Sequence, residues 1–230
     1  MARINVIIPA YNEEHSIGKV VAAIPAELVD DVIVVNNNST DATPAKALAA
    51  GATVLHEPRP GYGHACLKGI AHAAAKPVES RPDIIVFLDG DYSDFPEELP
   101  LVVQPIVDGT AEMVIGSRVL GKRESGSLLP QQLFGNWLAT QLLRLLYKVN
   151  YTDLGPFRAI KLDTLLNLGM QDRTYGWTVE MQAKAAKKKT PYAEVPVSYR
   201  KRIGKSKVSG TIKGSVMAGY KIIFTIFRYL

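Results

Sequence analysis

The chain has 230 residues, of which 47% are hydrophobic and 21% are charged, a balance typical of a globular domain that buries a sizeable core. It has no apolar run near the roughly 20 residues that a membrane-spanning helix needs. A single cysteine, Cys66, excludes an internal disulfide, and the four histidines lack the spacing of a metal site, which argues against disulfide scaffolds and zinc-finger domains.

The formal charge of +5 is unevenly distributed along the chain. Residues 187–230 contain eleven Lys and Arg against one acid, Glu194, so this tail carries +10 and the preceding part −5. A basic tail of this kind fits nucleic acid, an anionic membrane surface or a phosphorylated ligand. The first apolar run breaks at Pro9 and continues into acids, unlike a secretory signal, so we expect a cytoplasmic protein.

Taken in chain order, short β-branched runs alternate with helical patterns. The runs at 4–10, 30–36, 52–57, 83–89 and 111–117 predict buried strands, and the segments at 13–24, 43–50, 63–75 and 96–107 predict helices between them. This βαβ series predicts the α/β class, with a mostly parallel sheet flanked by helices on both faces. In such sheets ligands gather at the carboxyl ends of the strands.

Polar residues follow the first four of these strands. The segments read, in order, PAYNEE, NNNSTD, EPRPGYGHA and DGDYSD. Two nucleotide signatures are absent from this chain: a GxGxxG pattern fails at Cys66, and the GKS at 204–206 lacks the first Walker glycine, whose place Tyr199 takes. The sequence therefore has neither a Rossmann fingerprint nor a phosphate-cradling Walker loop.

Asp89 and Asp91 flank a glycine directly after the apolar run that ends at Leu88. Two carboxylates at the end of a buried strand are costly unless a cation pairs with them. Mg²⁺ and Mn²⁺ prefer oxygen ligands and commonly bridge a carboxylate to a substrate phosphate. The pair therefore predicts a metal site, although caps on the helix near Pro96 or lysine partners would also explain it.

Seven stretches resemble, in order, the family-two glycosyltransferases of the GT-A fold, and nearly the whole chain is covered. They read VIIPAYNEE, VVNNNSTDAT, PGYGHACLKGI, FLDGDYSDFPEEL, IGSR, DLGPFRAI and VPVSYRKRIGKSKVSGT. The resemblance is closest to the dolichyl- and polyprenyl-phosphate sugar synthases. It implies a Rossmann-like, nucleotide-sugar-binding GT-A domain at 1–208, followed by a basic amphipathic helix at 209–230.

The resemblance also implies a nucleotide site. Its residues would be Pro9, Tyr11, Glu13, Asn36, Asn37, Asp41, Gly63, Asp89, Arg200, Arg202 and Lys205, with Lys207 in the same basic loop. Family members usually have Asp-Asp-Gly-Ser where this chain has Asn36 to Ser39, so a turn that receives the base has amides in place of carboxylates. The choice between uracil and guanine stays open.

For the metal, the resemblance implies Mg²⁺ or Mn²⁺ held by Asp91 and Asp89 on the diphosphate, with Asp91 catalytic. Ser93 stands where Gln is often found, so a third ligand there is in doubt. Arg118 and Arg158 match arginines of the acceptor side, Arg158 with a catalytic role, and guanidinium suits phosphate. Ion pairs with neighbouring acids would also explain both arginines.

Glu180 is the candidate base, because a hydroxyl acceptor loses a proton as it attacks the anomeric carbon. A lipid phosphate is already ionised and needs no base, in which case Glu180 would organise the site or bind the sugar. A plain ion pair with Lys184, four residues along a helix, is the alternative without a role in the site.

The C-terminal segment places Lys213, Lys221 and Arg228 on one stripe of a helix that is otherwise largely apolar. This pattern predicts a helix lying on the inner, anionic face of a membrane, while docking on the core or on a second copy in a homodimer would use the same apolar surface.

The resemblance implies an inverting, metal-dependent hexosyltransferase with a nucleotide-sugar donor and a polyprenyl-phosphate acceptor; a glycan or small-molecule hydroxyl is the alternative acceptor. A nucleic-acid-binding module would leave the Asp89–Asp91 pair unexplained and lacks a recognition motif. A sugar nucleotidyltransferase would show a Gly-rich phosphate loop after the first strand, where this chain has PAYNEE.

Overall fold

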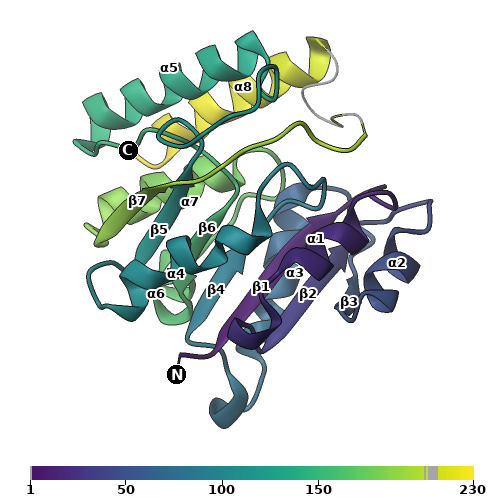
Figure 1. Ribbon diagram of the computed structural model, residues 1–230. Coiled ribbons are helices and arrows are strands. Elements are labelled where there is room, and N and C mark those ends of the chain that lie inside the picture. The colour runs from purple at the N-terminus through teal and green to yellow at the C-terminus, as the bar shows by residue number, and fades with distance from the viewer. Residues whose placement is uncertain (1, 205, 207–211) are drawn as a thin grey trace.

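The computed structural model describes residues 2–204, 206 and 212–230 (Figure 1). Within these residues seven strands form one sheet in the order β3-β2-β1-β4-β6-β5-β7. The strands are β1 (Ile4–Ala10), β2 (Asp31–Asn36), β3 (Thr53–His56), β4 (Ile84–Phe87), β5 (Met113–Ser117), β6 (Arg158–Lys161) and β7 (Tyr192–Pro196). The five predicted strands are all present, each within two residues of its expected bounds.

The sheet is mixed, with one antiparallel strand. Strands β3, β2, β1 and β4 run parallel, β6 runs antiparallel to both β4 and β5, and β7 runs parallel to β5. The predicted mostly parallel sheet is confirmed, and β6 and β7 are additions that the sequence did not reveal. Because β1, β2, β3 and β4 share a direction, their polar C-terminal loops meet at one edge.

Eight α-helices surround this sheet in the described part of the chain. They are α1 (Ile17–Ala23), α2 (Thr43–Ala49), α3 (Tyr62–Ala74), α4 (Leu99–Val107), α5 (Pro130–Tyr147), α6 (Leu162–Leu168), α7 (Trp177–Lys187) and α8 (Ile212–Arg228). Helix α1 begins four residues later than predicted, because Asn12 adopts a left-handed conformation (φ 53°) and the chain turns before Ser16. The predicted helix at 96–107 divides into a 3₁₀ turn (Pro96–Glu98) and α4.

Alternating side chains of the strands build two cores, one on each face of the sheet. Ile7, Ile33 and Phe87 point to the face covered by α3, α6 and α7. Val6 and Val34 point to the opposite face, which α1, α2 and α4 cover. This burial of β-branched residues on both faces is what the unbroken apolar runs in the sequence predict.

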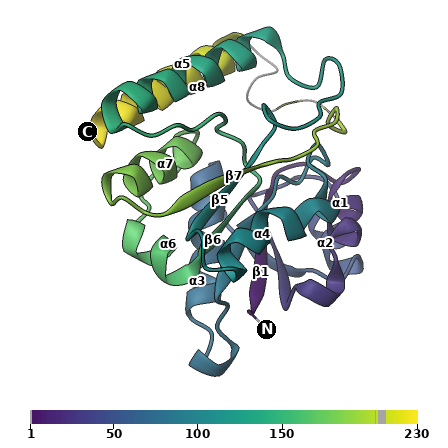
Figure 2. The same cartoon turned by 60° about the vertical axis from the view of Figure 1, so that its left-hand side comes forward.

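Helices α5 and α8 run side by side as an outer layer beyond α7, as both views show (Figures 1 and 2). The Tyr147 hydroxyl of α5 donates to the Ile226 carbonyl of α8 at 2.6 Å, and Thr225 and Ile226 are buried. One face of α8 therefore docks on the domain, while its other face remains exposed. No helix in the described ranges combines the length and the apolarity that crossing a membrane requires.

Candidate active site

A cleft of about 620 Å³ opens at the carboxyl ends of β1 and β4. One wall comes from the loops after the strands and includes Pro9, Tyr11, Glu13, Asn37, Asn38, Asp89 and Asp91. The facing wall comes from the outer helices and includes Gln131, Gln132, Gly135 and Asn136 of α5 with Ala218, Gly219 and Ile222 of α8. The cleft thus connects the polar edge of the sheet with the outer helical layer.

Asp89 and Asp91 enter the cleft on the tight turn after β4. Tyr92 adopts a left-handed conformation there (φ 63°), and Asp91 Oδ1 accepts hydrogen bonds from the backbone N–H (2.9 Å) and the hydroxyl (2.5 Å) of Ser93. Ser93 therefore orients Asp91. The other carboxylate oxygen of Asp91, Oδ2, forms an ion pair with Nη2 of Arg202.

The carboxylates fit a divalent cation that is shared with a diphosphate. Asp89 Oδ1 is buried and accepts no hydrogen bond from any described residue, so this oxygen has capacity for a ligand. The described residues contain no group of three or more His, Cys, Asp or Glu side chains arranged for a metal. The protein would supply two carboxylates, Asp89 and Asp91, and phosphate oxygens and water would complete the shell.

Burial dominates the electrostatics at this turn. It raises the pKa of Asp89, an effect that the nearby positive charges of Arg202, Arg118 and Arg158 counteract. Burial, reinforced by the negative charge of Asp89, raises the pKa of Asp94 to about 7. Asp89 and Asp94 are thus buried carboxyl groups whose ionised forms are costly, a setting that favours binding of a cation.

The loops after β1 and β2 are joined by hydrogen bonds into one unit. The Asn12 N–H donates to Ser39 Oγ (3.0 Å), Asn12 Oδ1 accepts from the Thr40 N–H (2.8 Å), and the Glu13 N–H donates to Thr43 Oγ1 (2.7 Å). This unit holds Pro9, Tyr11 and Glu13 at the cleft, where Tyr11 is 45% exposed. An exposed aromatic ring beside a polar turn provides a surface on which a nucleobase could stack.

The three asparagines have distinct structural functions. Asn36 Oδ1 accepts from the Ser39 N–H (2.9 Å), and Asn38 takes the left-handed conformation (φ 63°) that a glycine would also adopt. Asn37 Nδ2 donates to the carbonyls of Glu57 (3.1 Å) and Arg59 (2.7 Å), while its Oδ1 accepts from the Gly61 N–H (2.7 Å). An aspartate could not donate to those carbonyls, so the amide of Asn37 ties the β3–α3 loop to the cleft wall.

Asp41 and Gly63 support the cleft from outside its lining. Asp41 Oδ1 accepts from the Thr43 hydroxyl (2.5 Å) and N–H (2.9 Å), and Oδ2 accepts from the Glu14 N–H (3.2 Å). Partial burial opposes ionisation, but these hydrogen bonds, that of the Thr43 hydroxyl first, outweigh it and lower the pKa of Asp41. A Cβ on Gly63 would lie 2.0 Å from the Asp172 carbonyl oxygen, so glycine permits the close packing of α3 on that loop. Direct nucleotide contacts of Asn36, Asp41 and Gly63 stay a prediction.

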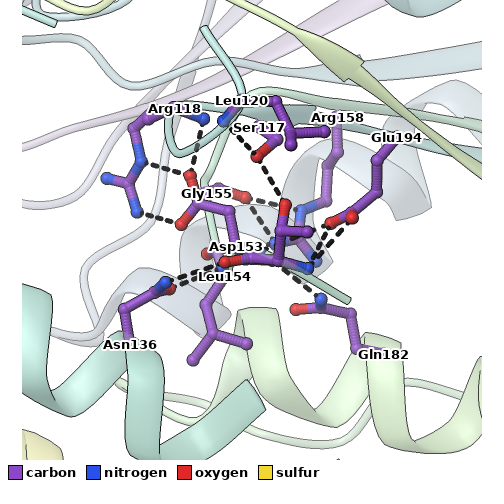
Figure 3. Close-up of polar contacts among 11 residues, drawn as sticks. Ser117, Arg118, Leu120, Asn136, Asp153, Leu154, Gly155, Arg158, Gln182 and Glu194 are labelled. Atoms are coloured by element: carbon purple, nitrogen blue, oxygen red, sulfur yellow. Dashed lines mark hydrogen bonds and ion pairs between the residues drawn. The ribbon is translucent and has the colours of Figure 1, made fainter. Parts of the chain in front are cut away.

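Arg118 lies in the cleft and is held by Asp153 in a two-pronged ion pair (Figure 3). Its Nε and Nη2 donate to the two carboxylate oxygens at 2.8 and 2.7 Å, and its guanidinium stacks on the Tyr199 ring with 5.0 Å to the centroid. The ion pair that the sequence left open is therefore present. The remaining nitrogen, Nη1, makes no hydrogen bond to any residue in the described ranges and is free to bind an anion.

Arg158 lies behind the cleft wall and is fully buried. Its guanidinium donates to the carbonyls of Leu154 (3.2 Å), Gly155 (3.1 Å from Nε) and Thr178 (3.0 Å), as Figure 3 shows in part. Burial lowers the pKa of Arg158. The geometry gives it the role of a positioning residue for the 154–158 turn, and a direct contact with the acceptor stays a prediction.

Glu180 is also fully buried and does not line the cleft. Its carboxylate accepts from the N–H groups of Gln171 (2.9 Å) and Asp172 (2.7 Å) and from the Tyr229 hydroxyl (2.8 Å). The ion pair with Lys184 at i+4, 2.7 Å, is present as well. With four partners this carboxylate anchors the loop before α7, and its service as a base remains only a prediction.

The two described arginines of the basic segment after β7, Arg200 and Arg202, have different positions relative to the cleft. Arg200 donates to the carbonyls of Tyr92 (2.8 Å) and Asp94 (3.0 Å) and stacks on the rings of Tyr92 and Phe95, so it stabilises the turn after β4 that carries Asp89 and Asp91. Arg202 lines the cleft. Lys205 and Lys207, also expected near the diphosphate, lie outside the described residues.

Several cleft residues were not among those expected from the sequence. Tyr62, Tyr175, Thr178 and Tyr199 line the cavity, and Asn136 of α5 links it to the 152–154 segment through bonds to the Thr152 carbonyl (3.0 Å) and the Leu154 N–H (2.8 Å). Tyr62 and Tyr199 fall inside family-like stretches and could have been noticed there. Asn136 gave no local signal, because its partners are 16 and 18 residues away.

Comparison with known proteins identifies the family to which this chain belongs. The profile of the family described as Glycosyl transferase family 2 matches residues 5–167. An uncharacterized glycosyltransferase of Mycobacterium tuberculosis is 37% identical over 94% of this chain and 94% of its own length, and an undecaprenyl-phosphate mannosyltransferase of Micrococcus luteus is 30% identical over 94% and 91%. The crystal structure of glucosyl-3-phosphoglycerate synthase from M. tuberculosis with Mn²⁺ and uridine diphosphate has a TM-score of 0.78 at 23% identity, covering 99% of this chain and 80% of its own. The chain therefore belongs to glycosyl transferase family 2 and has the GT-A fold.

Proposed function

We propose that this glycosyltransferase moves a hexose from a UDP- or GDP-linked donor to polyprenyl phosphate, with inversion at the anomeric carbon and with Mg²⁺ or Mn²⁺ as cofactor. The observation that carries the proposal is the lining of the cleft. Asp89, Asp91 and Arg118 line the same cleft as residues of α5 and α8, two helices that also expose large apolar side chains. Such a lining suits a polar donor at one end and a lipid-linked acceptor at the other.

At the donor end, Tyr11 offers a ring for the base, and Glu13, which lines the same wall of the cleft, would border the ribose. Asp89 and Asp91 would hold the metal, which when bound neutralises charge developing on the leaving diphosphate. Arg202 is placed to add a positive charge at the same point, and it binds Asp91 in the absence of ligand. These three charged groups account for binding and departure of a nucleoside diphosphate.

At the acceptor end, Arg118 offers Nη1 to a phosphate oxygen while Asp153 and Tyr199 fix the plane of its guanidinium. A phosphate acceptor enters as an anion, so it can attack without a base. The full hydrogen bonding of Glu180 supports this choice, because a carboxylate with four protein partners and no place in the cleft is poorly suited to accept a proton from a hydroxyl.

The outer surface of α5 and α8 favours a membrane. We call the exposed apolar side chains there the outer apolar face: Phe134, Trp137 and Leu145 of α5, and Val216, Met217, Tyr220, Phe224, Phe227 and Leu230 on or just after α8. Neither helix contains Asp or Glu, whereas Arg144, Lys221 and Arg228 provide positive charge. An anionic bilayer complements such a face, while a homodimer would bring two cationic faces together.

A panel of UDP- and GDP-sugars tested by titration calorimetry, first with Mn²⁺ and then with EDTA, examines the donor half of this proposal. Binding of one donor that is lost in EDTA is the expected result and identifies the base. Absence of binding by every donor in the presence of Mn²⁺ would mean that the fold no longer serves sugar transfer. Release of pyrophosphate in place of nucleoside diphosphate would indicate a nucleotidyltransferase.

A further inference from the structure

A second cavity of about 540 Å³ is lined by residues 170–174 of the loop whose Tyr175 lines the cleft. The two cavities share the elements that flank them but not their lining. Helix α3 contributes Tyr62 and Ala65 to the cleft and Leu67 to the second cavity, and α8 contributes Ile222 to the cleft and Lys221 to the second cavity. The second cavity therefore has no lining residue in common with the cleft.

Three cations and one carboxylate line this cavity: Arg173 of the loop, Lys221 and Arg228 of α8, and Asp172. Lys221 Nζ is 2.9 Å from Asp172 Oδ2, so that carboxylate is already paired. The guanidinium groups of Arg173 and Arg228 make no hydrogen bond or salt bridge to any residue that the structure describes, and Arg228 only approaches the Tyr229 ring, 5.6 Å from its centroid. Two unpaired guanidiniums beside a cavity are suited to bind a phosphate group.

The cavity borders the outer apolar face. Phe224 lies three residues after Lys221 and four before Arg228, so the three side chains share one side of α8. Phe224 is 46% exposed, and Phe227 next to it is 53% exposed. A ligand here would place an anion in the cavity while an apolar chain lies on Phe224, which is the arrangement of a phospholipid and not of a free phosphate ion.

We propose that the cavity lined by Arg173, Lys221 and Arg228 binds the phosphate headgroup of an anionic membrane lipid. This inference rests on the membrane association in the proposed function and deepens it, because it replaces a diffuse attraction between charges with one defined lipid site. Bound there, the headgroup would fix α8 and the 170–176 loop, whose Tyr175 lines the cleft, in one orientation to the bilayer.

The test measures partition of the full chain onto phosphatidylcholine vesicles that contain phosphatidic acid, for the wild type and for R173Q, R228Q and R144Q. Arg144 is an exposed arginine of α5 outside the cavity, so R144Q is matched in charge. Loss of one surface cation lowers partition about 5-fold, and we expect about 20-fold or more for R173Q and R228Q because they also lose a charge-assisted contact. Unchanged melting temperatures of all three variants would exclude misfolding.

Equal losses in R173Q, R228Q and R144Q would overturn the site, since diffuse electrostatics would then account for binding. Inorganic phosphate provides the second arm, followed by NMR at the amides of residues 170–174: saturation by phosphate alone, with vesicle partition of R173Q no weaker than that of R144Q, would assign the cavity to a soluble phosphate and overturn the lipid assignment. Failure of the wild type to bind vesicles would instead contradict the membrane association in the proposed function, a distinct result.

Discussion

The guanidinium of Arg202 forms an ion pair with the carboxylate of Asp91, the residue that we propose holds the metal. The side chain of Asp91 is almost fully buried, and its second oxygen is occupied by Ser93. Without donor, the protein thus satisfies the costly carboxylate with its own cation. A metal must compete with Arg202, and a diphosphate would offer Arg202 a new partner, so donor and metal are expected to bind together.

Replacing Arg202 should therefore strengthen binding of Mn²⁺ to the free protein. We expect R202Q to bind Mn²⁺ on the order of 10-fold more tightly than the wild type in the absence of nucleotide, because a competing positive charge has been removed. Electron paramagnetic resonance of free Mn²⁺ measures this directly. R123Q removes an exposed arginine outside the cleft and serves as the control; equal affinities of R202Q and R123Q would show that Arg202 does not occupy the metal's place.

Asp91→Asn should remove metal-dependent turnover, with a loss of about 10²-fold or more, because the amide keeps the shape but lacks the charge that binds the cation. The fold should persist, since Oδ1 of the new side chain can still accept from Ser93. Transfer rates with Mn²⁺ and with EDTA, measured beside thermal melting, separate the two effects. Near-normal transfer by D91N in Mn²⁺ would refute the metal assignment.

Asp94 should make the protein less stable as the pH rises. Its pKa in the folded protein is about 7 against 3.8 for the unperturbed group, so the folded state retains a proton that the unfolded state has lost between these values. The free energy of unfolding should fall by a few kcal/mol between about pH 4 and pH 7 and then level off. D94N, neutral at every pH, should lack this fall. Urea unfolding in metal-free buffer at pH 5 and pH 8 tests the difference, and parallel curves for both proteins would contradict it.

The sequence predicted the sheet better than it predicted the site. The strands β1 to β5 are β-branched runs buried on both faces, and this local pattern suffices to identify them. β6 is only four residues long and pairs antiparallel with β4, more than seventy residues earlier in the chain, so its pairing is invisible to local periodicity.

Within the site, the sequence predicted which residues reach the cleft, but it did not predict which residues they contact. Asp89, Asp91, Tyr11 and Arg118 reached the cleft from strand-end motifs, as expected. Arg158 has the residue type of a phosphate ligand, yet its buried guanidinium donates to the carbonyls of Leu154, Gly155 and Thr178. Such roles depend on contacts set by tertiary packing, which no local motif records.

Glu180→Gln should reduce stability more than catalysis. Its carboxylate serves two backbone N–H groups, Tyr229 and Lys184, so we expect a loss of roughly 1–3 kcal/mol in the free energy of unfolding. Transfer to polyprenyl phosphate should fall less than about 10-fold, whereas loss of a working base would reduce it about 10²-fold or more. Urea unfolding and turnover are measured together, and a turnover loss of that larger size with unchanged stability would identify Glu180 as the base.

The outer apolar face should bind vesicles through its aromatic side chains. The double substitution of Phe134 and Trp137, 62% and 55% exposed, by serine should lower partition onto anionic vesicles on the order of 10-fold or more, because a large apolar area no longer enters the bilayer. L48S changes an equally exposed residue on α2 and should have no effect. Equal partition of the double variant and the wild type would contradict membrane binding by the outer apolar face and would favour a protein partner there.

The central claim is that a hexose passes from a nucleotide sugar to a lipid phosphate, and the most direct measurement is mass spectrometry of the lipid product. The protein is incubated with Mn²⁺, undecaprenyl phosphate in vesicles, and each UDP- and GDP-sugar in turn. We predict one donor that yields a hexosyl phosphate lipid together with nucleoside diphosphate, and no product in EDTA. Nucleoside diphosphate released only when a hydroxyl acceptor such as 3-phosphoglycerate is supplied, with the lipid unmodified, would contradict the account.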